Sequence, residues 1–121
     1  NSTDASFTES YGGSNSGARH ATHWKNSAYR VYTDQTRTGL VNGLYTLRAY
    51  TKRGSGQNQC FMEAKNFGGT KRQLTIPVTG SYTMIEIKDI NVTNGQCTVG
   101  FFSDGNAGNW MYFDDVQFFK Q

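Results

Sequence analysis

Residues Ser103 to Phe119 read SDGNAGNWMYFDDVQFF, and this stretch decides the fold class. It opens on a loop rich in Gly and Asn, whose conformational freedom and short hydrogen-bonding side chains are typical of turns. The run that begins at Trp110 is rich in aromatic residues, which favour a strand. The pattern therefore predicts a loop that delivers Trp110 to the start of a final strand, where a flat apolar ring can meet a ligand.

The same alternation of strand and turn signals continues along the whole chain. Gly-, Asn- and Ser-rich turns separate short apolar runs at about ten-residue intervals, the spacing of a sandwich or barrel. Asn42-Gly43 and Asn94-Gly95 are predicted to be tight hairpin turns. We expect one all-β domain over residues 1–121, a two-sheet antiparallel β-sandwich (jelly roll). The predicted strands are 5–11, 18–24, 29–36, 43–52, 59–65, 71–76, 82–92, 96–103 and 110–119.

Alternation within two of these strands assigns their faces. Side chains of successive strand residues point to opposite sides of a sheet. Tyr45, Leu47 and Ala49 therefore share one face, and Ile85 and Ile87 share one face of a later strand. Both sets are predicted to point into the core.

Composition excludes several classes of protein. With 14 Gly, 1 Pro, 7 Tyr and 8 Phe, the 121 residues contain no convincing helical tract. A mean hydropathy of −0.65 and the lack of a long apolar run argue against a membrane span. The net charge of +3 is mild and its basic residues are scattered, so nucleic-acid binding is not indicated.

The two cysteines and the two histidines do not indicate a zinc site. Cys60 and Cys97 each open a predicted strand, and they fit either a disulfide or two buried thiols. His20 and His23 are three residues apart on a strand and point to opposite faces, so they cannot chelate one ion together.

The adjacent carboxylates Asp114 and Asp115 indicate a calcium site. On a strand one of them faces inward and needs a partner or a cation, for which calcium is suited. Asp114 is the favoured ligand, because it shares a face with Val116 and Phe118, the expected core side. A glycosidase needs two carboxylates that flank one bond, whereas a strand splays this pair apart, so we predict that the chain is not an enzyme.

Four longer motifs stand out along the chain: Thr22-His23-Trp24, Asn42-Gly43-Leu44-Tyr45-Thr46-Leu47, Ala64-Lys65-Asn66-Phe67-Gly68-Gly69 and Asp114-Asp115-Val116. They resemble motifs of the β-jelly-roll carbohydrate-binding modules of bacterial plant-cell-wall hydrolases. The resemblance is strongest to carbohydrate-binding module family 61, found beside endo-β-1,4-galactanases, and runs from about Ser16 onward. The opening Asn-Pro-Gly-Phe-Glu type of strand of such modules is missing, so the N-terminal strand is expected to be trimmed or divergent, and Glu9 or carbonyls near Ser16-Gly17 would complete the calcium site.

The resemblance implies a function as well as a fold. The expected role is a non-catalytic module that binds a plant cell-wall polysaccharide, β-1,4-galactan above all, and holds a tethered glycoside hydrolase on it. The expected setting is a secreted bacterial protein, monomeric, with no nucleic-acid or membrane partner. Another β-linked or pectic glycan, and a structural or adhesion sandwich without sugar contacts, are the alternatives. The candidate site residues are Trp24, Trp110, Asn109, Asn66, Arg19 and His23 for sugar, with Asp114 and Asp115 for a structural calcium ion.

Overall fold

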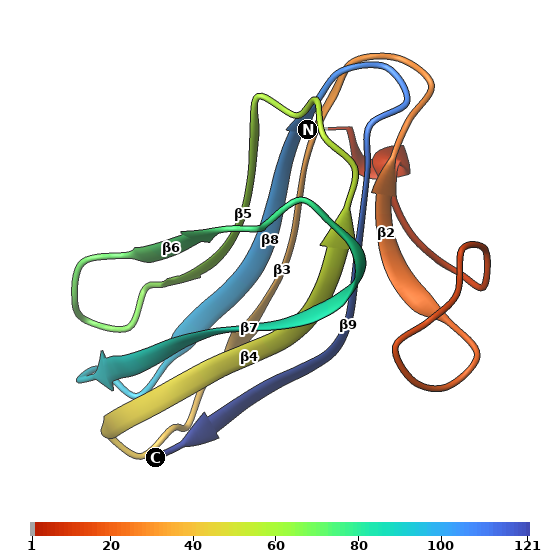
Figure 1. Ribbon diagram of the computed structural model, residues 1–121. Coiled ribbons are helices and arrows are strands. Elements are labelled where there is room, and N and C mark those ends of the chain that lie inside the picture. Colours follow the sequence, from red (N-terminus) through yellow and green to blue (C-terminus); the bar gives the residue numbers. More distant parts are fainter. Residues whose placement is uncertain (1) are drawn as a thin grey trace.

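Two antiparallel sheets face each other in the computed structural model, which describes residues 2–121 (Figure 1). The five-stranded sheet has the order β1-β2-β9-β4-β7, and the four-stranded sheet the order β3-β8-β5-β6. One 3-10 turn, η1 (Thr3–Ala5), precedes them, and no helix between Ser2 and Gln121 has the length and hydropathy of a membrane span. The strands are β1 (Ser6–Glu9), β2 (His20–Trp24), β3 (Tyr29–Arg37), β4 (Gly43–Arg53), β5 (Gln59–Lys65), β6 (Arg72–Thr75), β7 (Thr79–Val92), β8 (Cys97–Gly105) and β9 (Trp110–Lys120).

The predicted β-sandwich is confirmed, and each predicted strand has its counterpart within a few residues. The start of β7 differs most, because the strand begins at Thr79, three residues before the predicted start at residue 82, and so includes Gly80. There β7 is an edge strand, and its pairing with β4 resumes at Thr79 opposite Arg53 after a register shift. A bulge of this kind lets an edge strand continue through a glycine.

The two Asn-Gly turns do not form hairpins, which corrects the prediction. The turn at Asn42-Gly43 joins β3 to β4, and the turn at Asn94-Gly95 joins β7 to β8, so both cross from one sheet to the other. The two turns lie together, since the Gly95 amide donates to Asn42 Oδ1 at 3.0 Å and the Leu40 amide donates to the Gly95 carbonyl at 2.9 Å. An Asn-Gly pair fixes a local reversal, but it does not select the strand's partner.

The core lies between the sheets and contains the residues that the alternation predicted. Tyr45, Leu47 and Ala49 are buried, as are Ile85 and Ile87. Burial of a Leu or Ile side chain contributes about 1.5 to 3 kcal/mol each. Burial of these apolar side chains therefore determines which face of each sheet points inward. The outward faces are available for polar contacts and ligands.

The cysteines are buried free thiols rather than a disulfide. Cys60 pairs across the β5–β8 ladder with Ser103, whereas Cys97 lies six residues earlier on β8. At about 3.3 Å per strand residue the two cysteines are roughly 20 Å apart, far beyond the reach of a disulfide. Burial raises the pKa of Cys97 to about 11.

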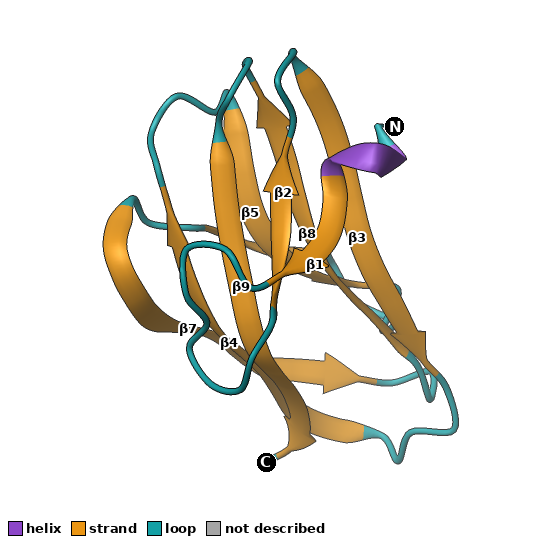
Figure 2. Ribbon diagram, turned by 90° about the vertical axis from the view of Figure 1, so that its right-hand side faces the viewer, coloured by secondary structure: helices purple, strands orange, loops and turns teal. Residues whose placement is uncertain are grey.

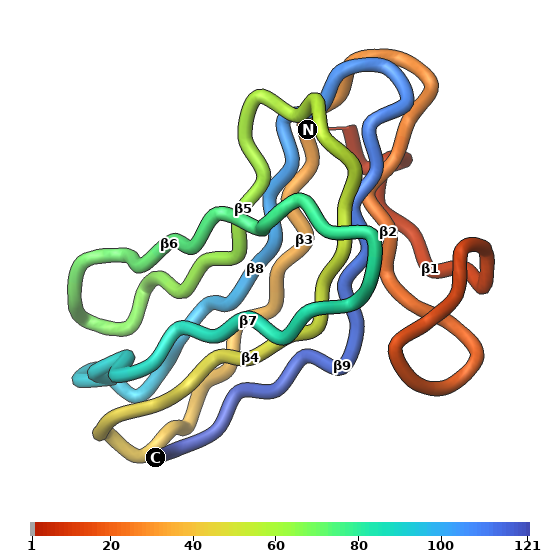
Figure 3. Tube along the Cα trace, viewed as in Figure 1, coloured from red at the N-terminus to blue at the C-terminus, as the bar shows by residue number. Residues whose placement is uncertain are grey.

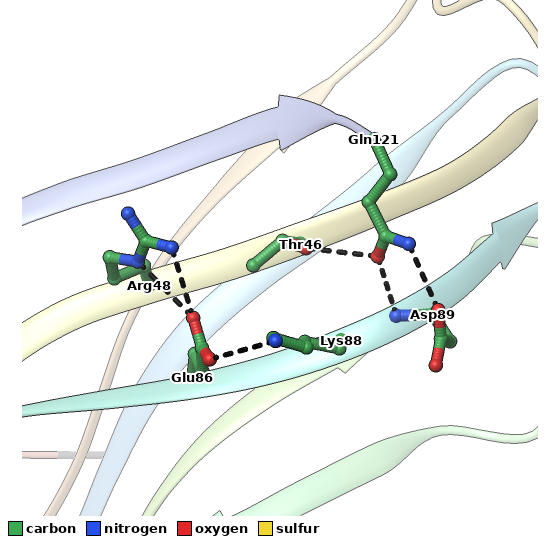
Figure 4. Close-up of polar contacts among 6 residues, drawn as sticks. All are labelled: Thr46, Arg48, Glu86, Lys88, Asp89 and Gln121. Atoms are coloured by element: carbon green, nitrogen blue, oxygen red, sulfur yellow. Dashed lines mark hydrogen bonds and ion pairs between the residues drawn. The ribbon is translucent and has the colours of Figure 1, made fainter.

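Polar side chains cover the outward face of β4 and β7 near the C-terminal end (Figure 4). Arg48 donates to one oxygen of Glu86 from Nε at 3.2 Å and Nη2 at 3.1 Å. The Gln121 amide accepts from Thr46 Oγ1 at 2.9 Å and donates to Asp89 Oδ1 at 2.9 Å. These contacts tie the end of the chain to both strands.

Candidate functional site

A groove of about 680 Å³ lies on the outward face of the five-stranded sheet. Its residues come from β1, β2, β4 and β9 and from the loop between β1 and β2, which crosses in front of β9 and β4 in Figure 2. Strand alternation explains the gathering, because paired residues of neighbouring strands point to the same side. The lining residues are Phe7, Glu9, Tyr11, Gly12, Thr22, Trp24, Lys52, Trp110 and Tyr112.

Trp24 and Trp110 are direct neighbours across the β2–β9 ladder and form one end of the groove. Trp24 is 41% exposed, and Trp110 is half-buried with its ring centroid 4.8 Å from that of Tyr112. A Cβ on Gly54 would lie 2.6 Å from Trp110 Nε1, so a glycine there lets the indole lie against the backbone of the β4 end. The sheet thus presents apolar ring surface that a ligand can cover.

Three polar groups stand beside these rings. Thr22 Oγ1 donates to Glu9 Oε2 at 2.6 Å, and Lys52 Nζ donates to the Gly12 carbonyl at 2.9 Å. Lys52 also lies over the Tyr112 ring, 5.4 Å from its centroid. A carboxylate, a hydroxyl and an ammonium group can together accept from and donate to the hydroxyl groups of a sugar.

His20 lies on the same face of β2 as Thr22 and Trp24, where Tyr11 of the β1–β2 loop contacts it. Its side chain is 2% exposed and its ring centroid lies 4.1 Å from that of Tyr112. His20 Nε2 is 2.7 Å from the Tyr11 carbonyl, which can only accept, so this nitrogen carries the proton. Burial lowers the pKa of His20, and the charge of Glu9 opposes that shift.

Of the six predicted sugar contacts, the structure brings Trp24 and Trp110 together in this groove. Asn109 precedes Trp110, but its side chain holds the loops: Oδ1 accepts from the Asn106 amide at 2.7 Å, and Nδ2 donates to the Ser55 carbonyl at 3.4 Å. Asn109 therefore positions Trp110 and is not part of the groove lining.

The structure places Arg19, Asn66 and His23 away from the groove. Arg19 is exposed and donates from Nη2 to the Thr8 carbonyl at 2.6 Å. Asn66 follows β5 of the other sheet in a left-handed conformation with φ of 59°, and donates to Thr98 Oγ1 at 3.2 Å. His23 is fully buried between the sheets, because it points to the opposite side of β2 from Thr22 and Trp24. All three therefore lie outside the groove, and its burial corrects the assignment of His23 as a sugar contact.

Sequence reasoning missed most of the other lining residues. Tyr112 could have been found, because it lies two residues after Trp110 on the same strand and so shares its face. Phe7, Tyr11 and Lys52 come to the groove only through strand pairing and the course of the β1–β2 loop. No local motif marks such long-range neighbours.

The predicted metal ligands bind the β1–β2 loop. Asp114 Oδ2 accepts from the backbone amides of Asn15 at 3.0 Å and Ser16 at 3.2 Å. Asp115 Oδ2 accepts from Asn15 Nδ2 at 2.8 Å, and Ser16 Oγ donates to Asp115 Oδ1 at 2.7 Å. These hydrogen bonds lower the pKa of Asp115.

The expectation that Asp114 faces the core with Val116 is wrong. Val116 is 42% exposed, and the β4–β9 pairing shifts register between Arg48 and Tyr50, opposite this segment. Asp115 has φ of 49°, so strict alternation fails here. Within residues 2–121 no cluster of three His, Cys, Asp or Glu is placed to hold a metal ion, whereas calcium needs six to eight oxygens. The pair fits calcium incompletely, because five donors already occupy its oxygens.

Comparison with proteins of known structure finds the same fold. No protein-family model matches the sequence. TmCBM61, solved in complex with β-1,4-galactotriose, superimposes with a TM-score of 0.88 at 20% identity over 99% of this chain and 85% of that one. A family 16 carbohydrate-binding module gives 0.69 at 14% identity over 96% and 86%. A sugar-binding protein of Bacteroides thetaiotaomicron, itself described as putative, gives 0.64 at 15% identity over 100% and 85%.

One curated relative adds a sequence match. A 1,6-alpha-glucosyltransferase of Sporosarcina globispora is 32% identical over 108 residues, or 88% of this chain. The chain spans 8% of the length of that enzyme. The structural matches lead to one conclusion: the chain has the β-sandwich fold of the carbohydrate-binding modules and resembles family 61 over nearly its whole length.

Proposed function

We propose that the chain is a non-catalytic module that binds β-1,4-galactan through the groove on its five-stranded sheet. The observation that carries the proposal is the tryptophan pair of an exposed Trp24 and a half-buried Trp110, beside a few polar groups. The apolar C–H face of a galactose ring can cover an indole while Glu9 and Lys52 exchange hydrogen bonds with its hydroxyls. TmCBM61, which shares the fold, was solved with a galactotriose, and this supports the choice of glycan.

The groove's chemistry supports binding without cleavage. Glu9 is the only carboxylate among the described residues that line it. Glycoside hydrolysis ordinarily uses two carboxyl groups about 5 to 9.5 Å apart. We propose that the module instead raises the local concentration of a tethered hydrolase on its polysaccharide, as a secreted bacterial monomer.

The test is retention on glycan. Purified protein is run through affinity gels that contain galactan, xylan, mannan, pectin or β-glucan, and calorimetry follows any retention. We expect retention by galactan with a Kd between tens of micromolar and millimolar, on the order of 4 to 6 kcal/mol, and no release of reducing sugar. Retention by another glycan but not by galactan would refute the ligand, and released sugar would refute the non-catalytic role.

A second candidate ligand is an α-glucan. The relative of 32% identity is named a 1,6-alpha-glucosyltransferase, and the matching segment is a small part of that enzyme. A stacked ring selects for flat apolar sugar surface and not for one linkage, so the same groove could accept glucose units. Gels with α-1,4- and α-1,6-glucan belong in the same series, and retention there without galactan would favour this candidate.

Calcium at Asp114 and Asp115 would compete with the hydrogen bonds that the β1–β2 loop donates to both carboxylates, and chelation decides between the two. An ion that ties β9 to the N-terminal segment would stabilise the native state by mass action. Because hydrogen bonds from Asn15 and Ser16 already tie the carboxylates to the loop, we expect excess EDTA to leave the Tm unchanged. We also expect Asp115→Asn to lower the Tm equally with and without EDTA. A lower Tm in EDTA, restored by added calcium, would establish the ion.

A further inference from the structure

The loop between β1 and β2 lies outside the five-stranded sheet, to the right of β2 in Figure 3, and crosses the outward face of the sheet in the view of Figure 2. We call residues 10–17 the strap. Its carbonyls are held by three strands: Tyr11 by His20 of β2, Gly12 by Lys52 of β4, and Gly13 by Tyr82 of β7, with distances of 2.7, 2.9 and 2.9 Å. The carboxylates of Asp114 and Asp115 on β9 hold its second half. The strap is thus fixed at both of its halves.

The strap lies directly on the groove's floor. A Cβ on Gly12 would lie 2.5 Å from Tyr112 Oη, and Gly12 has φ of 81°, so this position requires glycine on both counts. The backbone can therefore touch the Tyr112 ring. Beyond that ring, the next residue of β2 on the same face is His20, which the strap leaves only 2% exposed. No room remains there for a sugar unit.

Lys52 of β4 closes a second side of the groove. Lys52 bridges the strap to the aromatic floor, since its Nζ binds the Gly12 carbonyl and lies 4.8 Å from the Tyr82 ring centroid. At the other end the groove is open, because Trp24 is 41% exposed and Phe7 is 37% exposed. A polymer that enters over the tryptophan pair meets the strap and cannot leave by the opposite side.

We propose that the strap acts as an end-stop, so that the groove takes the terminal units of a polysaccharide chain and not an internal stretch. This inference rests on the proposed glycan-binding function. It assigns the strap as the feature that sets where on the polymer the module binds. A groove that accepted internal stretches would need two open ends along the path of the chain, and here one of them is filled by Tyr11, Gly12 and Lys52.

The experiment varies the number of chain ends at constant mass. Galactan is shortened by an endo-galactanase to a series of mean lengths, and binding capacity per gram is measured by calorimetry. We expect capacity to rise by the same factor by which the mean length falls. A capacity that stays constant or falls would overturn the end-stop. If galactan is not retained, the same series is run with the glycan that is, and failure to bind any glycan refutes both proposals.

A strap variant distinguishes an end-stop from chain-length effects. Tyr82→Phe with Asp115→Asn removes ties from both halves of the strap and changes no lining residue of the groove. We expect this double variant to gain capacity on long galactan while its affinity for galactotriose changes less than the capacity. The matched control is Asp89→Asn, which lies at the far end of the sheet. Equal capacities for the double variant and the control would overturn the assignment.

Discussion

Replacement of Trp24 by alanine is expected to lower galactan affinity by roughly 5- to 150-fold, or about 1 to 3 kcal/mol, without loss of the fold. Trp24 is 41% exposed at the open end of the groove, so its ring can meet sugar and contributes little to the core. Trp110→Ala should cost a similar affinity and some stability, because its ring packs on Tyr112 and against Gly54. Calorimetry measures the affinity, and urea unfolding the stability.

Phe119→Ala is the matched control for these variants. Phe119 belongs to the same strand as Trp110 and is 38% exposed, but it lies under Arg48 outside the groove. We expect its removal to leave affinity unchanged. If both tryptophan variants bound glycan with unaltered affinity, the groove would not be the glycan site.

The sequence was a good guide to elements because strand signals are local. Alternation of apolar and polar residues placed Leu47 and Ile87 in the core, as the structure confirms. Sheet partners were harder, because the turns at Asn42-Gly43 and Asn94-Gly95 look like hairpins but join opposite sheets. The pairing of strands depends on how the apolar faces of whole sheets are buried against each other, and no short segment of the sequence contains that information.

The candidate site could also be predicted only in part from the sequence. Trp24 and Trp110 were found because large rings at strand ends are distinctive. His23 was misassigned although it alternates with Trp24, since the family motif that joins them says nothing about faces. Lys52 comes from a distant strand, and its role depends on the strap it binds. The tryptophans of the groove could thus be predicted from the sequence, whereas Lys52 and the strap could not.

The free energy of unfolding is expected to fall by up to about 3 kcal/mol between pH 6.5 and pH 4, because of His23. This imidazole is fully buried between Ser103 Oγ and Thr33 Oγ1, each 2.8 Å away, and burial lowers its pKa from 6.5 to about 4. The unfolded chain takes up a proton near pH 6.5, but the native state does so only near pH 4. Between these values the unfolded state binds more protons, so acid favours unfolding.

Urea unfolding at several pH values, with the variant His23→Gln, isolates this group. Glutamine can still hydrogen-bond Ser103 and Thr33 but does not titrate, so the variant should lose most of the slope between pH 6.5 and pH 4. His20→Gln is the control, because the pKa of His20 is also lowered by burial but is opposed by nearby Glu9 and Asp114. The control should keep most of the slope. If His23→Gln retained the full acid dependence while His20→Gln lost it, the destabilisation would arise beneath the strap and not between the sheets.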